Sequence, residues 1–167
     1  MINEEAPLNI ITQLSDYLNK HELTEKKNDF NNFYQDDDDH KVRDYIIYNA
    51  YRITNELEIK AVVCYTENWF TTSRLSSLSP KVPVIAFTKS DETYRYLNSL
   101  RWVKGYKISQ SFNYENLKRI WKEMIRIIFK GNISLDDKIV IVQANEVIRD
   151  EKTDMINWLE LYKFKNI

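Results

Sequence analysis

Apolar residues follow two different spacings along most of this chain, and the two spacings alternate. Nearly continuous apolar runs occur at 60–66, 82–87, 103–108 and 138–142, and segments with helical spacing separate them. Continuous runs are typical of strands buried on both faces. Such strands, separated by helices, indicate a parallel sheet with right-handed crossovers. We therefore predict an α/β fold.

Three of the helical segments are clear from spacing alone. One is predicted from about Lys41 to Glu58, one from about Asp91, and a long one at 114–130. The apolar stripe of the first helix is expected to face inward, and it consists of Val42, Ile46, Ala50, Ile53 and Leu57. A shorter helix is expected after the first strand, where hydroxyl-bearing residues follow the apolar run.

The long helix at 114–130 carries basic residues at steps of four. They are Lys118, Lys122, Arg126 and Lys130, opposite an apolar stripe of Leu117, Ile120, Trp121, Met124 and Ile128. A nucleic-acid surface is one interpretation of this basic row. Acidic residues at positions 115 and 123 interrupt it, so we favour an ordinary solvated face.

The two ends of the chain read differently from its centre. Residues 8–23 have amphipathic helical spacing, and 24–39 lose periodicity and gain Asn and Asp, as a linker does. We therefore divide the chain into an N-terminal helix and acidic linker (1–40) and a main domain (41–167). The acidic run Asp36–Asp39 is interpreted as solvated carboxylates at the positive end of the next helix, rather than a metal site.

The last apolar segment, around 157–164, is ambiguous between an antiparallel edge strand and a terminal helix. Its pattern places one set of residues outward and another inward, although the alternation is imperfect. The outward set is Trp158, Glu160 and Tyr162, and the inward set is Leu159, Leu161 and Phe164.

The counts of glycine, histidine and cysteine exclude several kinds of binding site. Only two glycines occur, Gly105 and Gly131, so the multi-glycine turns that bring backbone amides to a nucleotide cannot form. The two histidines, His21 and His40, are too few and too far apart to suggest a zinc ligand set. The single cysteine, Cys64, lies in a strand pattern and is expected to be a buried, inert thiol. We expect no metal and no cofactor.

Charge and hydropathy limit the class of partner. The chain has 24 basic and 25 acidic residues and a formal net charge of −1, so we expect no nucleic-acid partner. Its longest apolar runs fall far short of the roughly 20 residues that a membrane span needs, and residues 1–9 do not resemble a signal sequence. We therefore expect a cytoplasmic protein with no membrane partner.

Candidate site residues follow the first predicted strand. In an open parallel sheet, ligands bind beyond the carboxyl ends of the strands, where helix N-termini present backbone N–H groups. That rim is Thr66 to Ser73. The hydroxyls of Thr71, Thr72 and Ser73 suit either a bound anion or capping of the following helix, and capping alone explains them.

The same stretch resembles the carboxy-terminal domain of pyruvate kinase. That family reads strand, Thr-x-Ser-Gly-x-Thr-Ala-Arg, then Ser, Pro and Pro-Ile-x-Ala-x-Thr, and this chain has "TENWFTTSRLSSLSPKVPVIAFT" in its place. The matching residues are Thr66, Glu67, Thr71, Ser76, Pro80, Pro83, Ala86 and Thr88. The resemblance covers about 41–162. It implies a three-layer α/β/α sandwich with a mostly parallel sheet and an antiparallel last strand.

The chain departs from the family pattern where phosphate would bind. In many pyruvate kinases this loop holds a phosphate of a sugar bisphosphate activator. Here Asn68 stands at the position of the serine, Trp69 at the glycine and Ser73 at the arginine. We therefore expect a phosphate loop that is degraded or filled, formed by Thr66, Asn68, Thr71, Thr72 and Ser73.

The resemblance also limits the expected function. Catalysis in the family belongs to a barrel domain of about 200 residues or more, so we assign no catalytic residue here. We expect a regulatory or structural subunit that docks on a pyruvate kinase barrel chain or forms a homo-oligomer. Two alternatives stay open: a component of an unrelated complex recruited through 8–23, and a small-phosphometabolite sensor.

Overall fold

The structure is a computed structural model that describes residues 12–13, 16, 38–109, 114–149 and 152–166. Helices and strands alternate through this part of the chain up to a final pair of strands. In chain order the elements are α2 (Asp38–Glu56), β1 (Ile59–Tyr65), α3 (Phe70–Ser77), β2 (Val84–Thr88), α4 (Asp91–Leu97), β3 (Val103–Lys107), α5 (Tyr114–Ile128), β4 (Lys138–Arg149), β5 (Lys152–Lys163) and the short 3-10 helix η2 (Phe164–Asn166).

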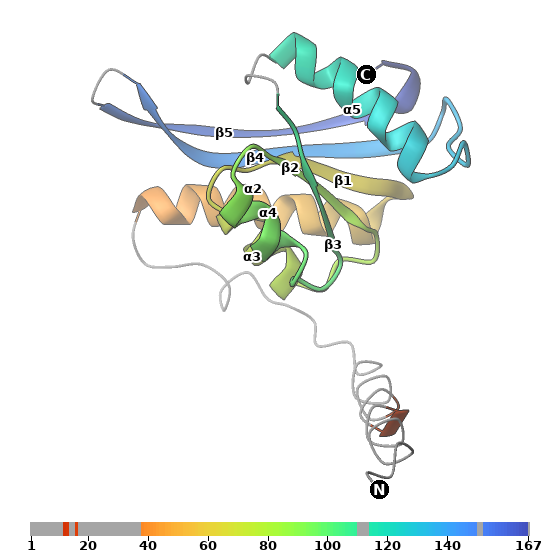
Figure 1. Cartoon of the computed structure of the whole chain (residues 1–167), viewed down its shortest axis with the longest axis horizontal. Helices are drawn as coiled ribbons and strands as arrows, with labels where there is room; N and C mark the ends of the chain where they lie inside the picture. The colour runs from red at the N-terminus through yellow and green to blue at the C-terminus, as the bar shows by residue number, and fades with distance from the viewer. Residues whose placement is uncertain (1–11, 14–15, 17–37, 110–113, 150–151, 167) are drawn as a thin grey trace, which may run out of the picture.

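The described strands form one sheet in the order β3-β2-β1-β4-β5. Every neighbouring pair is parallel except β4 and β5, which pair in antiparallel orientation over twelve residues each. Helices α2, α3 and α4 pack on one face of the sheet and α5 on the other (Figure 1). This three-layer arrangement, with its antiparallel last strand, confirms the predicted fold.

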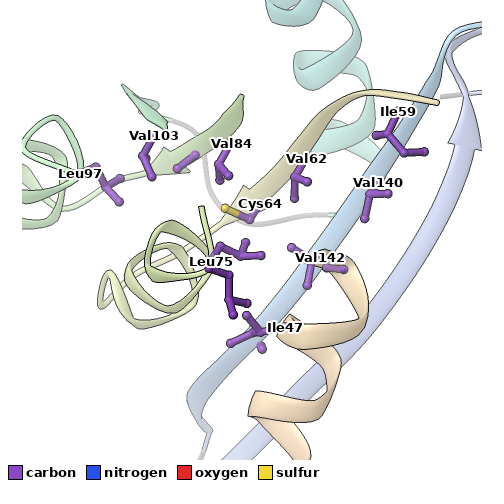
Figure 2. Packing of buried hydrophobic residues seen from close by; sticks show 14 residues of the cluster. Ile47, Ile59, Val62, Cys64, Leu75, Val84, Leu97, Val103, Val140 and Val142 are labelled. Atoms are coloured by element: carbon purple, nitrogen blue, oxygen red, sulfur yellow. The ribbon is translucent and has the colours of Figure 1, made fainter. Parts of the chain in front are cut away.

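The central strand β1 is buried on both faces, which explains its unbroken apolar sequence. Val62 and Cys64 belong to the core under α2, α3 and α4, whereas Ala61, Val63 and Tyr65 belong to the core under α5. Figure 2 shows the first of these cores, in which side chains from α2 and α3 meet those of the central strands.

The inward stripe predicted for α2 is right at Ile46, Ala50 and Ile53, which lie in or against the core, and wrong at its two ends. Val42 is 53% exposed and Leu57 is 42% exposed. The buried positions of the helix are Arg43, Asp44, Ile47, Ala50 and Thr54. The helix turns its polar residues inward because α3 supplies partners for them: Arg74 pairs with Asp44, and the Phe70 ring lies 3.4 Å beneath the Arg43 guanidinium carbon.

The final segment of the chain is a strand and not a helix. Because β5 pairs with the whole length of β4, the strand predicted at 138–142 continues to Arg149, beyond the last residue that pairs with β1. The predicted facing is right for Leu159 and Phe164, which lie against or in a core, but wrong for Leu161 and Tyr162. Leu161 is 46% exposed, whereas Tyr162 packs against the core under α5.

The other boundaries shift by a few residues. β2 begins at Val84, two residues later than predicted, and α2 begins at Asp38, inside the acidic run. Of the helix predicted at 8–23, only Thr12, Gln13 and Asp16 lie in the described part, where they are helical and exposed. The linker at 24–37 lies outside it, so the division at residue 40 stays a prediction.

Among the described residues, no helix is long and apolar enough to cross a bilayer. The same residues contain no group of three or more His, Cys, Asp or Glu side chains that could hold a metal ion.

Candidate functional site: the carboxyl edge of the sheet

The loop between β1 and α3 forms the rim of the sheet's carboxyl edge. Thr66 extends β1 by one backbone hydrogen bond, its N–H donating to the Phe87 carbonyl at 2.9 Å. The chain then turns at Trp69, which precedes α3 and has a left-handed backbone with φ of 54°. That conformation costs a residue other than glycine about 1–2 kcal/mol. A tryptophan therefore adopts here a left-handed backbone that glycine usually supplies.

The threonine hydroxyls of the first turn of α3 point to protein carbonyls. Thr71 Oγ1 donates to the carbonyl of Ala144 on β4 at 2.8 Å, and Thr72 Oγ1 donates to the carbonyl of Trp69 at 2.7 Å. Both threonines are fully buried. Within the described part of the chain, no side chain caps the N-terminus of α3. The hydroxyls therefore tie α3 to β4 and to its own turn.

Of the five predicted site residues, Thr71, Thr72 and Ser73 lie together in the first turn of α3. Thr66 is fully buried at the end of β1, and its Oγ1 has no hydrogen-bond partner among the described residues. Ser73 is half-buried, and its N–H donates to the Trp69 carbonyl at 2.9 Å. Asn68 is exposed on the loop and does not join this group.

The Trp69 indole packs sideways onto α4. Its ring centroid lies 4.8 Å from that of Tyr96, at an interplanar angle of 42°, and the residue is 42% exposed. Such a tilted aromatic pair is worth about 0.5–1.5 kcal/mol beyond its buried area. This contact offsets much of the cost of the left-handed backbone.

Carboxylates and lysines both lie at this edge of the sheet. Tyr65 donates its hydroxyl to Glu67 Oε1 at 3.2 Å, and burial, with a smaller contribution from Glu67, raises the pKa of Tyr65 above its usual value. Asp91 and Glu92 lie in the first turn of α4. Asp91 pairs with Lys107 at 2.6 Å, a contact that lowers the pKa of Asp91. A multiply charged anion would therefore meet both signs of charge here, the exposed carboxylates of Glu67 and Glu92 and the exposed Lys89.

An ion pair beside the site is not apparent from the sequence. Arg74 follows Ser73 on α3 and forms two hydrogen bonds with Asp44 of α2, Nε to Oδ1 at 3.1 Å and Nη2 to Oδ2 at 2.7 Å. The Asp44 side chain is fully buried. Nothing in the local pattern pairs residues thirty positions apart, so only the packing of α2 on α3 reveals it.

A comparison with protein-family models matches residues 44–157 to the pyruvate kinase, alpha/beta domain. The chain belongs to this family. The match includes all of β1, β2, β3 and β4, and therefore the entire parallel part of the sheet. No curated protein matches the chain in a sequence search.

In this pyruvate kinase alpha/beta domain, the chain turns after β1 at Trp69, whose φ is 54°. The sequence resemblance predicts a glycine at this position. The threonine hydroxyls donate to the carbonyls of Ala144 and Trp69. Phosphate binding here stays a prediction to be tested, as does its loss.

Proposed function

We propose that this pyruvate kinase alpha/beta domain acts as a non-catalytic interaction module, a regulatory or structural subunit that docks on a pyruvate kinase chain or on a second copy of itself. The described residues supply one layered sheet, and the chemistry of the family belongs to a barrel domain. A glycolytic family supports a cytoplasmic location. The free edge of β5 is the observation that carries the proposal.

The two edges of the described sheet differ in how well they resist pairing. The β3 edge is only five residues long, and it carries exposed Lys104 and Lys107, which are charges that discourage strand addition. The β5 edge is twelve residues long, pairs on one side only, and exposes Leu161, and an exposed lysine, Lys163, lies at the very end of the strand. An incoming strand would therefore add to β5.

Light scattering of the purified full-length chain over a concentration series tests this proposal. We expect association, and we expect Leu161→Lys to weaken it at least about tenfold, equivalent to about 1.4 kcal/mol. Leu135→Lys is the matched control, because Leu135 is also exposed, at 56%, but lies outside the strands. A chain that stays monomeric and also fails to bind a purified pyruvate kinase would remove the proposal.

Deletion of residues 1–35 separates docking by the sheet from docking by the N-terminal segment. Association that persists without these residues supports the β5 edge. Binding lost on deletion, but unaffected by Leu161→Lys, favours instead a component of another complex recruited through 8–23.

A second candidate function, a phosphometabolite sensor, has one specific observation in its favour. Thr66 Oγ1 is buried without a partner among the described residues, on the strand that leads into the uncapped α3. If a sugar phosphate binds there, a hundredfold excess over Kd stabilises the fold by about 2.7 kcal/mol, and Thr71→Ala reduces the effect. Thermal melts that do not move with inorganic phosphate or a sugar bisphosphate exclude this function.

A further inference from the structure

A pocket lies at the end of the sheet opposite the carboxyl-edge site, at the amino ends of β2 and β3. Its volume is about 290 Å³. It is lined by Lys81, Val82, Pro83, Trp102, Val103 and Lys104. These residues come from the two segments that lead into β2 and β3, so the sheet itself holds the pocket in shape.

The floor and wall of this pocket are apolar. Val103 is almost fully buried, and Val82 and Pro83 are half-buried. Trp102 is 41% exposed and has a left-handed backbone with φ of 66°. Its carbonyl accepts a 2.9 Å hydrogen bond from the Val84 N–H, which fixes the backbone from which the indole projects. A large aromatic surface is thus held next to solvent.

The rim of the pocket is basic. Lys81 and Lys104 are both exposed, and the Arg101 guanidinium carbon lies 4.8 Å from the Trp102 ring centroid. Arg101 is itself anchored, since its carbonyl accepts a 2.6 Å hydrogen bond from Ser76 Oγ on α3. None of the described residues that line the pocket is acidic. In a chain with a net charge of −1, this is a local concentration of positive charge.

We propose that this pocket docks an acidic peptide segment of a partner protein, with one apolar side chain of that segment inserted against Trp102. The volume suits a single aromatic or large aliphatic side chain and falls at the small end of the range for drug-sized ligands, about 300–1,000 Å³. Carboxylates next to that anchor meet the exposed Lys104 at the rim of the pocket. A lone phosphate would leave the apolar floor uncovered.

This inference rests on the proposed interaction role, but it uses a different surface from the β5 edge. Buried aromatic anchors supply most of the affinity of protein interfaces, and charges at the rim mainly set specificity and association rate. Trp102 therefore provides the contact energy, and Lys104 selects acidic sequences.

Fluorescence anisotropy with a labelled synthetic peptide, Asp-Asp-Trp-Asp-Asp, tests the docking on the full-length chain. We expect saturable binding that weakens with added salt. Replacing the peptide tryptophan by alanine, or its aspartates by asparagines, is expected to weaken binding at least about fivefold.

Two protein variants and one control locate the binding. Lys104→Glu is expected to weaken binding at least about tenfold. Trp102→Asn is expected to weaken it about fivefold, and asparagine tolerates the left-handed backbone, so the fold is kept. Lys89→Glu makes the same charge change at an exposed lysine beyond the carboxyl end of β2 and should alter binding less than about twofold.

Absence of binding at millimolar peptide overturns the inference, as does an equal effect of Lys104→Glu and Lys89→Glu, which would indicate only general charge attraction. Leu161→Lys separates the two proposals. If peptide docking fails while association through β5 persists, only the pocket is excluded. If Leu161→Lys has no effect on association while the pocket still binds peptide, only the β5 edge is excluded.

Discussion

The buried ion pair between Asp44 of α2 and Arg74 of α3 offers the sharpest test of how this fold is held together. The Asp44 side chain is fully buried, the Arg74 side chain is 24% exposed, and the closest contact is 2.7 Å. Arg74→Met removes the cation and keeps most of the side-chain volume. It leaves the buried Asp44 carboxylate without the Arg74 guanidinium.

Removing the cation from beside this buried carboxylate is expected to lower the stability of the fold substantially. Breaking a buried pair by removing one partner costs about 3–5 kcal/mol, and the partial exposure of Arg74 reduces the expected value to about 2–4 kcal/mol. Asp44→Asn should cost less, about 1–2 kcal/mol, because Arg74 already reaches solvent and keeps an amide oxygen as acceptor. For a chain of this size, Arg74→Met corresponds to a decrease in Tm of roughly 5–15 °C.

Urea denaturation followed by circular dichroism measures this difference, with unchanged slopes showing that the transition is the same. Arg52→Met is the control, because it removes an ion pair of the same length, 2.7 Å to Glu56, whose side chains are 52% and 57% exposed. That exposed pair should contribute no more than about 0.5 kcal/mol. If Arg74→Met costs no more than Arg52→Met, the buried pair does not stabilise the packing of α2 on α3, and the reasoning fails.

Other predictions concern packing, backbone and the thiol. Gly105→Ala should destabilise the fold by about 1–3 kcal/mol in thermal melts, because the added Cβ would lie 2.8 Å from Leu97 Cβ. Gly131→Ala should destabilise it by only about 1 kcal/mol, because Gly131 has φ of 79° but lies in open space. Trp69→Gly should leave Tm within about 3 °C of wild type, since relief of the left-handed strain offsets the lost contact with Tyr96, and a large decrease in Tm would show that the ring contact dominates. Burial raises the pKa of Cys64 from 9.0 to about 12, so the thiol should react with Ellman's reagent only on unfolding. The same shift favours the unfolded state as pH rises above 9, where the unfolded thiol ionises first, and a Cys64→Ala variant should lose less stability between pH 8 and 11.

Spacing along the chain was enough to predict the alternating elements because burial on both faces of a parallel sheet demands continuous apolar strands. The family resemblance at Thr66, Thr71 and Pro83 also anticipated the order of the elements and the antiparallel β5. The buried face of α2 could be predicted only in part in this way. Its buried positions include Arg43 and Asp44, which a hydrophobic pattern assigns to solvent.

In the candidate site, too, the sequence predicted the local structure and the packing decided the contacts. The sequence placed Thr71, Thr72 and Ser73 at the start of a helix, but the role of each hydroxyl depends on what lies opposite. Thr71 reaches the Ala144 carbonyl, a residue seventy-three positions away that β4 brings beside α3. The basic pocket at Trp102 also has no local signature, because its two sides come from the segments before β2 and before β3.

Local chemistry along the chain therefore decided where helices and strands form, which strands are central, and that nucleotide-binding glycine loops are excluded. Packing decided which polar residues are buried, where Leu161 and Tyr162 point, and how Trp69 keeps a turn usually made by glycine. The physical reason is the distance along the sequence between residues that interact. Hydrophobic periodicity reflects residues a few positions apart. The partner that offsets the free-energy cost of a buried charge or a left-handed backbone lies on another element.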